Sequence, residues 1–147
     1  MRRTATALPA LAALALAGAC APGGSAPPPP EPEPDPGLYS DTQADRGRDA
    51  FRASCAECHY SSEFRGSQFQ FAWRRRSVGD LFTEIVRNMP EDAPGSLEDQ
   101  VYVDIVAYIL QLNGFPAGSR ELPPDQAVLG RHSMAAPAGA APSGERP

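Results

Sequence analysis

The 147-residue sequence contains no lysine, one tryptophan, two histidines and three cysteines. Without lysine, no side-chain amine can serve as a metal ligand. The region from Leu38 to Gly130 holds nine arginines against fourteen aspartates and glutamates, a formal charge of −5. This acidic balance argues against a nucleic acid partner, because nucleic acids are bound chiefly by neutralising their phosphates with Lys and Arg. The apolar stretch near the N-terminus is shorter than the roughly 18 to 20 residues that a membrane span requires.

The start of the chain has the features of a targeting segment. Arg2 and Arg3 precede a short apolar region, and small residues from Ala17 onward form a cleavage site, which predicts a signal peptide over residues 1–19. Cys20 follows directly, as in bacterial lipoprotein signals, although Ala17 stands where that pattern has Leu. Cys20 would otherwise be an unpaired thiol in an exported protein. We therefore expect Cys20 to be lipidated and to anchor the protein at the periplasmic side of a membrane, with plain secretion as the alternative.

Composition divides the rest of the chain into three parts. Residues 20–37 form a linker with eight prolines between Ala21 and Gly37. This linker should be extended and, at about 3.1 Å per residue, should reach at most about 50 Å. Residues 38–130 predict one small folded domain with a limited core of its own. Residues 131–147 are rich in Ala, Pro and Gly and predict a disordered tail.

The most informative stretch is Cys55-Ala56-Glu57-Cys58-His59, which has the C-x-x-C-H spacing of a c-type haem attachment sequence. Two such thiols can form thioether bonds to the two vinyl groups of a haem, and His59 can bind the iron as an axial ligand. A C-x-x-C pair can also be a redox dithiol or half of a zinc site. A redox dithiol would require a surrounding βαβ pattern, which is not visible here. A zinc site would need further ligands, for which only Cys20 and His132 remain, both in low-complexity sequence.

Apolar periodicity and capping residues predict three helices. The first begins near Ser40 and runs into the haem motif. The second opens at Ser77 and is stopped by Pro90. In both, the residue three positions after the serine is suited to closing a capping box. The third is the clearest: Ser96 caps it, an apolar stripe follows, and Asn113-Gly114 is a C-cap signal.

The residues of these helices resemble class I cytochromes c. The matching positions are Gly47-x-x-x-Phe51, Cys55-x-x-Cys58-His59, Met89-Pro90 and Ala107-Tyr108. The resemblance implies an all-α class I cytochrome c fold, with three main helices around one covalently bound haem c. In that family the N- and C-terminal helices cross closely, with a glycine permitting contact and aromatic residues filling the crossing. Gly47, Phe51 and Tyr108 match those places.

A closer resemblance is to the small cytochromes c paired with periplasmic quinoprotein dehydrogenases. It rests on Trp73, Val78-Gly79-Asp80-Leu81-Phe82, Pro94-Gly95-Ser96-Leu97, Val106-Ala107-Tyr108-Ile109-Leu110, Asn113-Gly114-Phe115-Pro116-Ala117-Gly118 and Glu121-Leu122-Pro123. This likeness implies redox partner proteins: a dehydrogenase as electron donor, and an oxidase or another cytochrome as acceptor.

Met89 is the candidate second axial ligand. A thioether is a soft donor that favours ferrous iron, and Pro90 turns the chain outward at Met89. The alternative is a core methionine that fills a gap, which is the commoner role of Met in a helix. Of the competing ligands, Met1 leaves with the signal peptide, and His132 and Met134 lie in the predicted tail.

Two features of the segment after the haem motif bear on the haem surroundings. Many class I cytochromes c have a proline soon after the motif, whose carbonyl accepts the ring N–H of the axial histidine. The sequence has no proline between His59 and Pro90, so another acceptor must orient the ring. Trp73 and the following Arg74-Arg75-Arg76 could donate hydrogen bonds to the haem propionates. A solvated face, or docking to an acidic partner, would explain the arginines equally well.

The sequence therefore predicts an exported mono-haem c-type cytochrome that carries one electron between a dehydrogenase, such as a quinoprotein, and the respiratory chain. It should not be an enzyme in its own right, because His59 and Met89 would occupy both axial positions. Two alternatives stay open. If Met89 does not bind iron, the haem could serve a gas sensor or a peroxidase-like enzyme. The protein could also be a fixed cytochrome subunit of a dehydrogenase complex.

Overall fold

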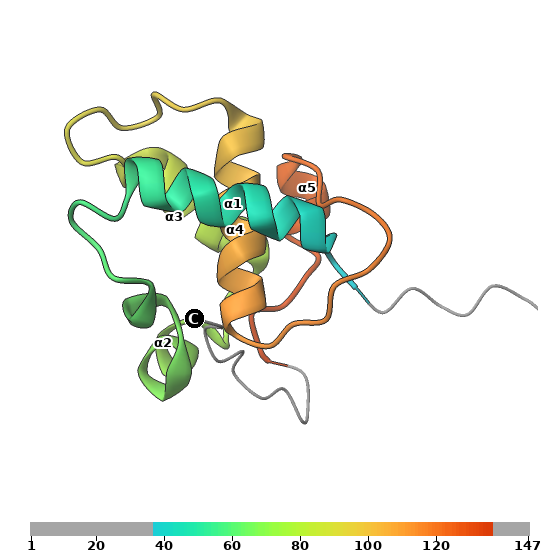
Figure 1. The fold of residues 1–147 in the computed structure, drawn as a ribbon. Coiled ribbons are helices and arrows are strands. Elements are labelled where there is room, and N and C mark those ends of the chain that lie inside the picture. Colours follow the sequence, from blue (N-terminus) through green and yellow to red (C-terminus); the bar gives the residue numbers. More distant parts are fainter. Residues whose placement is uncertain (1–36, 137–147) are drawn as a thin grey trace, which may run out of the picture. The chain divides into compact units, whose positions relative to one another are not determined.

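The computed structural model describes residues 37–136 (Figure 1). Its elements, in chain order, are α1 (Asp41–Ser54), η1 (Ser61–Phe64, a 3-10 helix), α2 (Gly66–Trp73), α3 (Val78–Asn88), α4 (Asp99–Leu112) and α5 (Gln126–Leu129). Within these residues the chain is helical and has no strand, so the predicted all-α class is confirmed. The predicted signal peptide, Cys20, nearly all of the proline-rich linker, and the tail from residue 137 onward lie outside the described residues. None of the described helices combines the length and apolarity needed to cross a bilayer.

The centre of the domain is the contact between α1 and α4, which lie across one another in Figure 1. Gly47 of α1 sits at this crossing: a Cβ atom there would lie 1.8 Å from the carbonyl oxygen of Asp104 in α4. The rings of Phe51 and Tyr108 pack beside it, with centroids 5.7 Å apart. A side chain of any size at Gly47 would separate the two helices.

The predicted start of the first helix is confirmed, but its capping box is not. The Ser40 hydroxyl accepts a hydrogen bond from the Gln43 backbone N–H at 3.1 Å. The Gln43 side chain does not return to Ser40; it is fully buried and donates to Asp104 Oδ1 at 3.1 Å and to the Leu122 carbonyl at 2.9 Å. The Leu122 N–H donates back to the Gln43 amide oxygen at 2.8 Å. Gln43 thereby ties α1 to α4 and to the segment before α5.

The second helix follows its sequence signals closely. Ser77 caps α3 by accepting from the Asp80 N–H at 3.1 Å, and the Asp80 carboxylate accepts from the Ser77 N–H at 2.8 Å. The helix ends at Asn88, and Met89 adopts an extended backbone (φ −130°, ψ 150°). This is the conformation that a following proline favours.

The predicted start of the third helix is wrong. Helix α4 begins at Asp99 with Glu98 at its N-cap, so the cap lies two residues after the predicted one at Ser96. The preceding residues form turns instead: Gly95 has a positive φ of 74°, and the Leu97 N–H donates to the Tyr102 hydroxyl at 3.3 Å. The end of the helix is as predicted, with Asn113 at the C-cap and Gly114 at φ 73°.

The folded part of the chain extends beyond Gly130, where the sequence placed the start of the tail. The N–H of Val78 donates to the His132 carbonyl at 2.8 Å, and the N–H of Met134 donates to the Arg76 carbonyl at 3.0 Å. The Met134 side chain is fully buried. Residues 131–134 therefore pack against the start of α3, and Met134 belongs to the core.

Candidate cofactor site

The domain contains a cavity of about 500 Å³ between the end of α1, the α2 region, α3 and α4. Cys55, Cys58, His59, Met89 and Trp73 all line it. Five of the six site residues predicted from the sequence are thus brought together around one space, although they are spread over 35 positions of the chain. The sixth, Cys20, lies outside the described residues.

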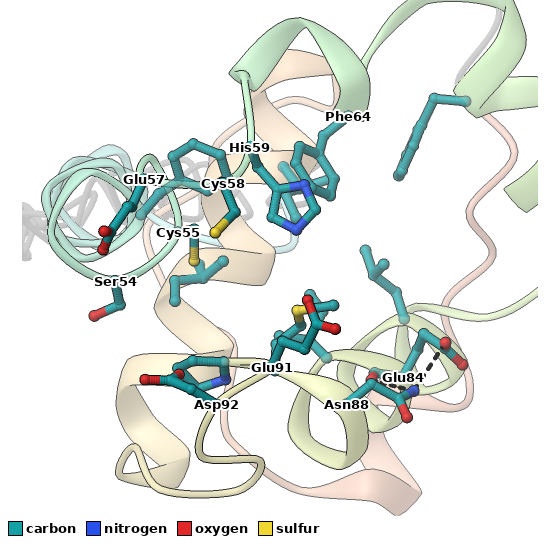
Figure 2. Close-up of a pocket in the computed structure, with 18 of the residues that line it drawn as sticks. Ser54, Cys55, Glu57, Cys58, His59, Phe64, Glu84, Asn88, Glu91 and Asp92 are labelled. Carbon is teal, nitrogen blue, oxygen red and sulfur yellow. Dashed lines mark hydrogen bonds between the residues drawn. The ribbon is translucent and has the colours of Figure 1, made fainter.

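One wall of the cavity is the turn that follows α1. Cys55 caps the helix with its N–H bonded to the Phe51 carbonyl at 2.8 Å. The chain then winds on, because the N–H groups of Cys58 and His59 both donate to the Cys55 carbonyl, at 3.1 and 2.9 Å. Figure 2 shows the two sulfur atoms and the His59 ring pointing into the cavity from this turn. Burial raises the pKa of the Cys55 thiol above its ordinary value.

Met89 approaches the cavity from the end of α3. Its N–H donates to the Ile85 carbonyl at 2.8 Å, and its own carbonyl accepts from the Tyr102 hydroxyl at 2.7 Å. In Figure 2, Asn88, which precedes Met89, and Glu91, two residues after it, lie across the cavity from His59. Tyr102, 1% exposed, thus fixes the backbone where the chain leaves α3.

The remaining lining is mostly apolar. Aromatic and aliphatic side chains from the helices cover the interior: Phe51, Phe64, Phe69, Trp73, Leu81, Ile85, Ile105 and Ile109. Acidic residues lie at the cavity as well, and Figure 2 labels Glu57, Glu84, Glu91 and Asp92. The cavity therefore has an apolar interior with sulfur and imidazole donors and a carboxylate-bearing boundary.

Residues 42–109 match the family model described as "Cytochrome C oxidase, cbb3-type, subunit III". This match contains the C-x-x-C-H motif, Met89 and the α1–α4 crossing. The domain is a class I mono-haem cytochrome c. Its cofactor is one covalently bound haem c. Neither the comparison with curated proteins nor that with solved structures found a match.

The residues at the cavity of this cytochrome fit a haem. The two thiols and the imidazole that would attach and ligate the porphyrin share one wall, and a thioether is available from α3. The apolar lining suits a planar, largely hydrophobic group. The zinc alternative gains no support, since residues 37–136 hold no group of three or more His, Cys, Asp or Glu placed to bind a metal ion.

The aromatic side of the cytochrome's cavity is built around Trp73. Its ring stacks on Phe69 with centroids 6.0 Å apart, and the Arg76 guanidinium lies 4.8 Å from the Trp73 ring centroid. Arg74 lies instead over Phe71, at 5.4 Å, and the Phe71 ring is exposed. Of the three predicted arginines, Arg76 thus lies over a ring that lines the cavity.

The main feature that sequence reasoning missed is a carboxylate beside the axial histidine. His59 Nδ1 and Glu63 Oε2 lie 3.2 Å apart. The other oxygen of Glu63 accepts the Tyr60 N–H at 2.8 Å. The hydrogen bond from the Tyr60 N–H lowers the pKa of Glu63 below its ordinary value, and the contact with His59 lowers it further. The signal in the sequence was a carboxylate four residues after the histidine, but its use depended on an unpredicted helical turn, η1.

Proposed function

We propose that Cys55 and Cys58 form the two thioether bonds to the haem and that His59 and Met89 are the axial ligands of its iron. The proposal rests on one observation: these four side chains, which come from two separate segments, line the same cavity. A methionine that only filled a gap in the core would have no reason to line the same cavity as a histidine and two cysteines. Trp73, which lines the cavity too, we propose as a haem contact.

We propose that the protein is an exported electron carrier, which takes one electron from a dehydrogenase and passes it to an oxidase or another cytochrome of the respiratory chain. A quinoprotein is the proposed donor, on the strength of the sequence resemblance described above. Cys20 is the proposed lipid anchor at the periplasmic side of the membrane, and the proline-rich linker would let the domain reach partners within about 50 Å. We propose no catalytic role, since both axial positions are assigned to protein ligands.

The protein's own residues account for the properties that a carrier needs. A haem held here supplies reversible one-electron chemistry at its iron. The thioether of Met89 is a soft donor that favours the reduced state, relative to a second nitrogen ligand. The aromatic and aliphatic lining restricts water, and the Tyr102 bond to the Met89 carbonyl holds the ligand-bearing segment in place.

The ligation is tested by optical spectroscopy of holoprotein matured in an export-competent host. The oxidised wild type should show the weak sulfur-to-iron charge-transfer band at the red end of the spectrum, and Met89→Ala should lose it. Met134→Leu is the matched control, because Met134 is fully buried but does not line the cavity. A band that survives Met89→Ala would refute the assignment.

Carbon monoxide separates the carrier from the gas-sensing or peroxidase-like alternative. With Met89 on the iron, the reduced wild type should resist carbon monoxide at neutral pH, whereas Met89→Ala should bind it rapidly. Rapid binding by the wild type would favour a haem with an open position.

One observation favours a second candidate, a fixed subunit of a larger complex. The family model that matches this domain is described as subunit III of an oxidase. Purification from solubilised membranes tests it: a carrier should separate from its partners, whereas a subunit should co-purify with a large oxidoreductase. Membrane fractionation of Cys20→Ala tests the anchor, and the anchor proposal fails if this variant stays on the membrane.

A further inference from the structure

The immediate surroundings of His59 differ from the pattern common in class I cytochromes c. No proline follows the haem motif to present a backbone carbonyl to the ring N–H. In its place a carboxylate oxygen, Glu63 Oε2, lies 3.2 Å from Nδ1 of His59. A carboxylate and a carbonyl both accept a hydrogen bond, but only the carboxylate carries a full negative charge.

We propose that Glu63 is the positioning residue of the axial histidine: it accepts the Nδ1–H of His59, directs Nε2 toward the iron, and lowers the reduction potential of the haem. The inference rests on the proposed ligation of the iron by His59. It assigns to this chain a charged acceptor where many class I cytochromes c use a neutral carbonyl.

The geometry of η1 shows how Glu63 is held in this role. Tyr60 has an extended backbone (φ −98°, ψ 139°), so the chain restarts as a short helix with Glu63 at its third position. Glu63 Oε1 accepts the Tyr60 N–H at 2.8 Å, which leaves Oε2 to face the imidazole. Glutamate is ionised at neutral pH, and a carboxylate has no proton to donate. Since a carboxylate can only accept, the proton of the pair must sit on Nδ1, and the lone pair is left on Nε2.

The residue after Glu63 anchors the turn to the rest of the domain. The Phe64 ring meets the rings of His59 and Phe51 edge-on, at centroid distances of 5.4 and 5.5 Å. The Phe64 carbonyl accepts from the Asn113 amide at 2.7 Å. The backbone that carries Glu63 is therefore fixed to α1 and α4, and its carboxylate can leave the ring only by giving up the hydrogen bond from the Tyr60 N–H.

The chemical consequence follows from the charge. A carboxylate that accepts a ligand's ring N–H makes the imidazole a stronger electron donor to its metal. The ferric state is more positive than the ferrous state, so it gains more from this donation and from the nearby negative charge. Solvent weakens the effect, since the side chains of His59 and Glu63 are 30% and 48% exposed. We expect the potential to be lower than it would be with a neutral acceptor.

The test compares Glu63→Gln with Glu91→Gln in the holoprotein. Glu91 lines the cavity, so its variant removes a nearby negative charge without removing the partner of Nδ1. Reduction potentials are measured by spectroelectrochemical titration. The Nδ1–H of His59 is followed by ¹⁵N-edited NMR of the reduced protein. We expect Glu63→Gln to shift the potential to a more positive value than Glu91→Gln does, to move the Nδ1–H resonance and to speed its exchange with water.

The results separate failure of this inference from failure of the proposed ligation. If the wild type binds haem through His59 and Met89 but Glu63→Gln and Glu91→Gln behave alike in both readouts, the role of Glu63 is overturned and the ligation stands. If Glu63→Gln does not mature, the ¹⁵N-edited NMR spectrum of the reduced wild type still tests the role of Glu63. A rapidly exchanging Nδ1–H without the downfield shift of a strong hydrogen bond would overturn the inference. A wild type without haem bound through His59 would overturn the ligation and this inference together.

Discussion

The close crossing of α1 and α4 makes Gly47→Ala the substitution with the best-defined effect on stability. The new Cβ would lie 1.8 Å from the Asp104 carbonyl oxygen and 2.4 Å from its carbonyl carbon. To move from 1.8 Å to the 3.4 Å at which ordinary contact begins, the helices would have to separate by about 1.6 Å. Both obstructing atoms are backbone, so no side-chain rotation relieves the clash.

Two opposing contributions set the size of the effect. A gap of even 0.5–1 Å between packed surfaces forfeits about a quarter to a half of their dispersion attraction. Overpacking of this kind commonly costs about 1–3 kcal/mol, and a backbone clash belongs at or above the top of that range. Alanine offsets about 1 kcal/mol of this by its better helix propensity. We therefore expect the free energy of unfolding to fall by about 2–4 kcal/mol.

Urea unfolding of the oxidised holoprotein, followed by far-UV circular dichroism, measures this difference. With a slope of about 1–2 kcal/mol per molar urea, the midpoint should fall by roughly 1–2 M or more. Asp49→Ala is the control, since Asp49 lies exposed on the same helix and its loss should change stability by no more than about 0.5 kcal/mol. A Gly47→Ala protein as stable as the wild type, or more stable, would refute the close crossing.

Three further substitutions test other contacts. Tyr102→Phe removes the hydroxyl that donates to the Met89 carbonyl at 2.7 Å and should weaken the fold by about 1–3 kcal/mol, so that the charge-transfer band is lost at a lower temperature on heating. Asn113→Ala leaves the last carbonyl of η1 without its 2.7 Å partner and should cost about 2–3 kcal/mol in urea unfolding. Arg46 lowers the pKa of Glu121 below its ordinary value of 4.5, so their ion pair stabilises the fold above pH 4.5 and is lost as the pH falls through the lower folded-state value. Glu121→Gln should therefore lose under about 1 kcal/mol at neutral pH and show a shallower loss of stability in acid.

Each of the three has an outcome that would contradict it. Tyr108→Phe leaves the Met89 carbonyl bonded, so a band as heat-sensitive in this variant as in Tyr102→Phe would argue against a specific hydroxyl contact. An Asn113→Ala protein as stable as the wild type would show that the η1 carbonyl is satisfied in another way. If Glu121→Gln loses stability in acid as steeply as the wild type does, the ion pair with Arg46 contributes nothing measurable.

Local sequence signals were sufficient where one turn of chain decides the structure. Ser77 with Asp80, Pro90 after Met89, and Gly114 after α4 each act within four residues, and each was found where predicted. The haem motif belongs to the same class, since its spacing alone places two thiols and an imidazole together. The joint presence of these residues and Met89 at one cavity followed from the family resemblance more than from any local pattern.

Two of the features that sequence reasoning missed depend on contacts between residues far apart in the chain, and the start of α4 depends on a nearer one. Ser96 was a reasonable cap, but the Leu97 N–H is taken by the Tyr102 hydroxyl, and α4 starts later. The Gln43 side chain donates a hydrogen bond to the Leu122 carbonyl, 79 positions away, instead of capping its own helix. The low complexity around Met134 predicts a tail, yet its N–H donates to the Arg76 carbonyl just before α3 and its side chain is buried. No periodicity in the surrounding sequence predicts such pairings.

The central claim is that a haem is joined covalently to Cys55 and Cys58 and that His59 and Met89 hold its iron. The most direct measurement is on mature protein purified from an export-competent host: its mass after denaturation, together with its oxidised and reduced optical spectra. The account predicts a polypeptide heavier by one haem that extraction does not remove, with low-spin six-coordinate spectra and the red sulfur-to-iron band. A colourless protein with the mass of the bare polypeptide and two unmodified thiols would contradict it.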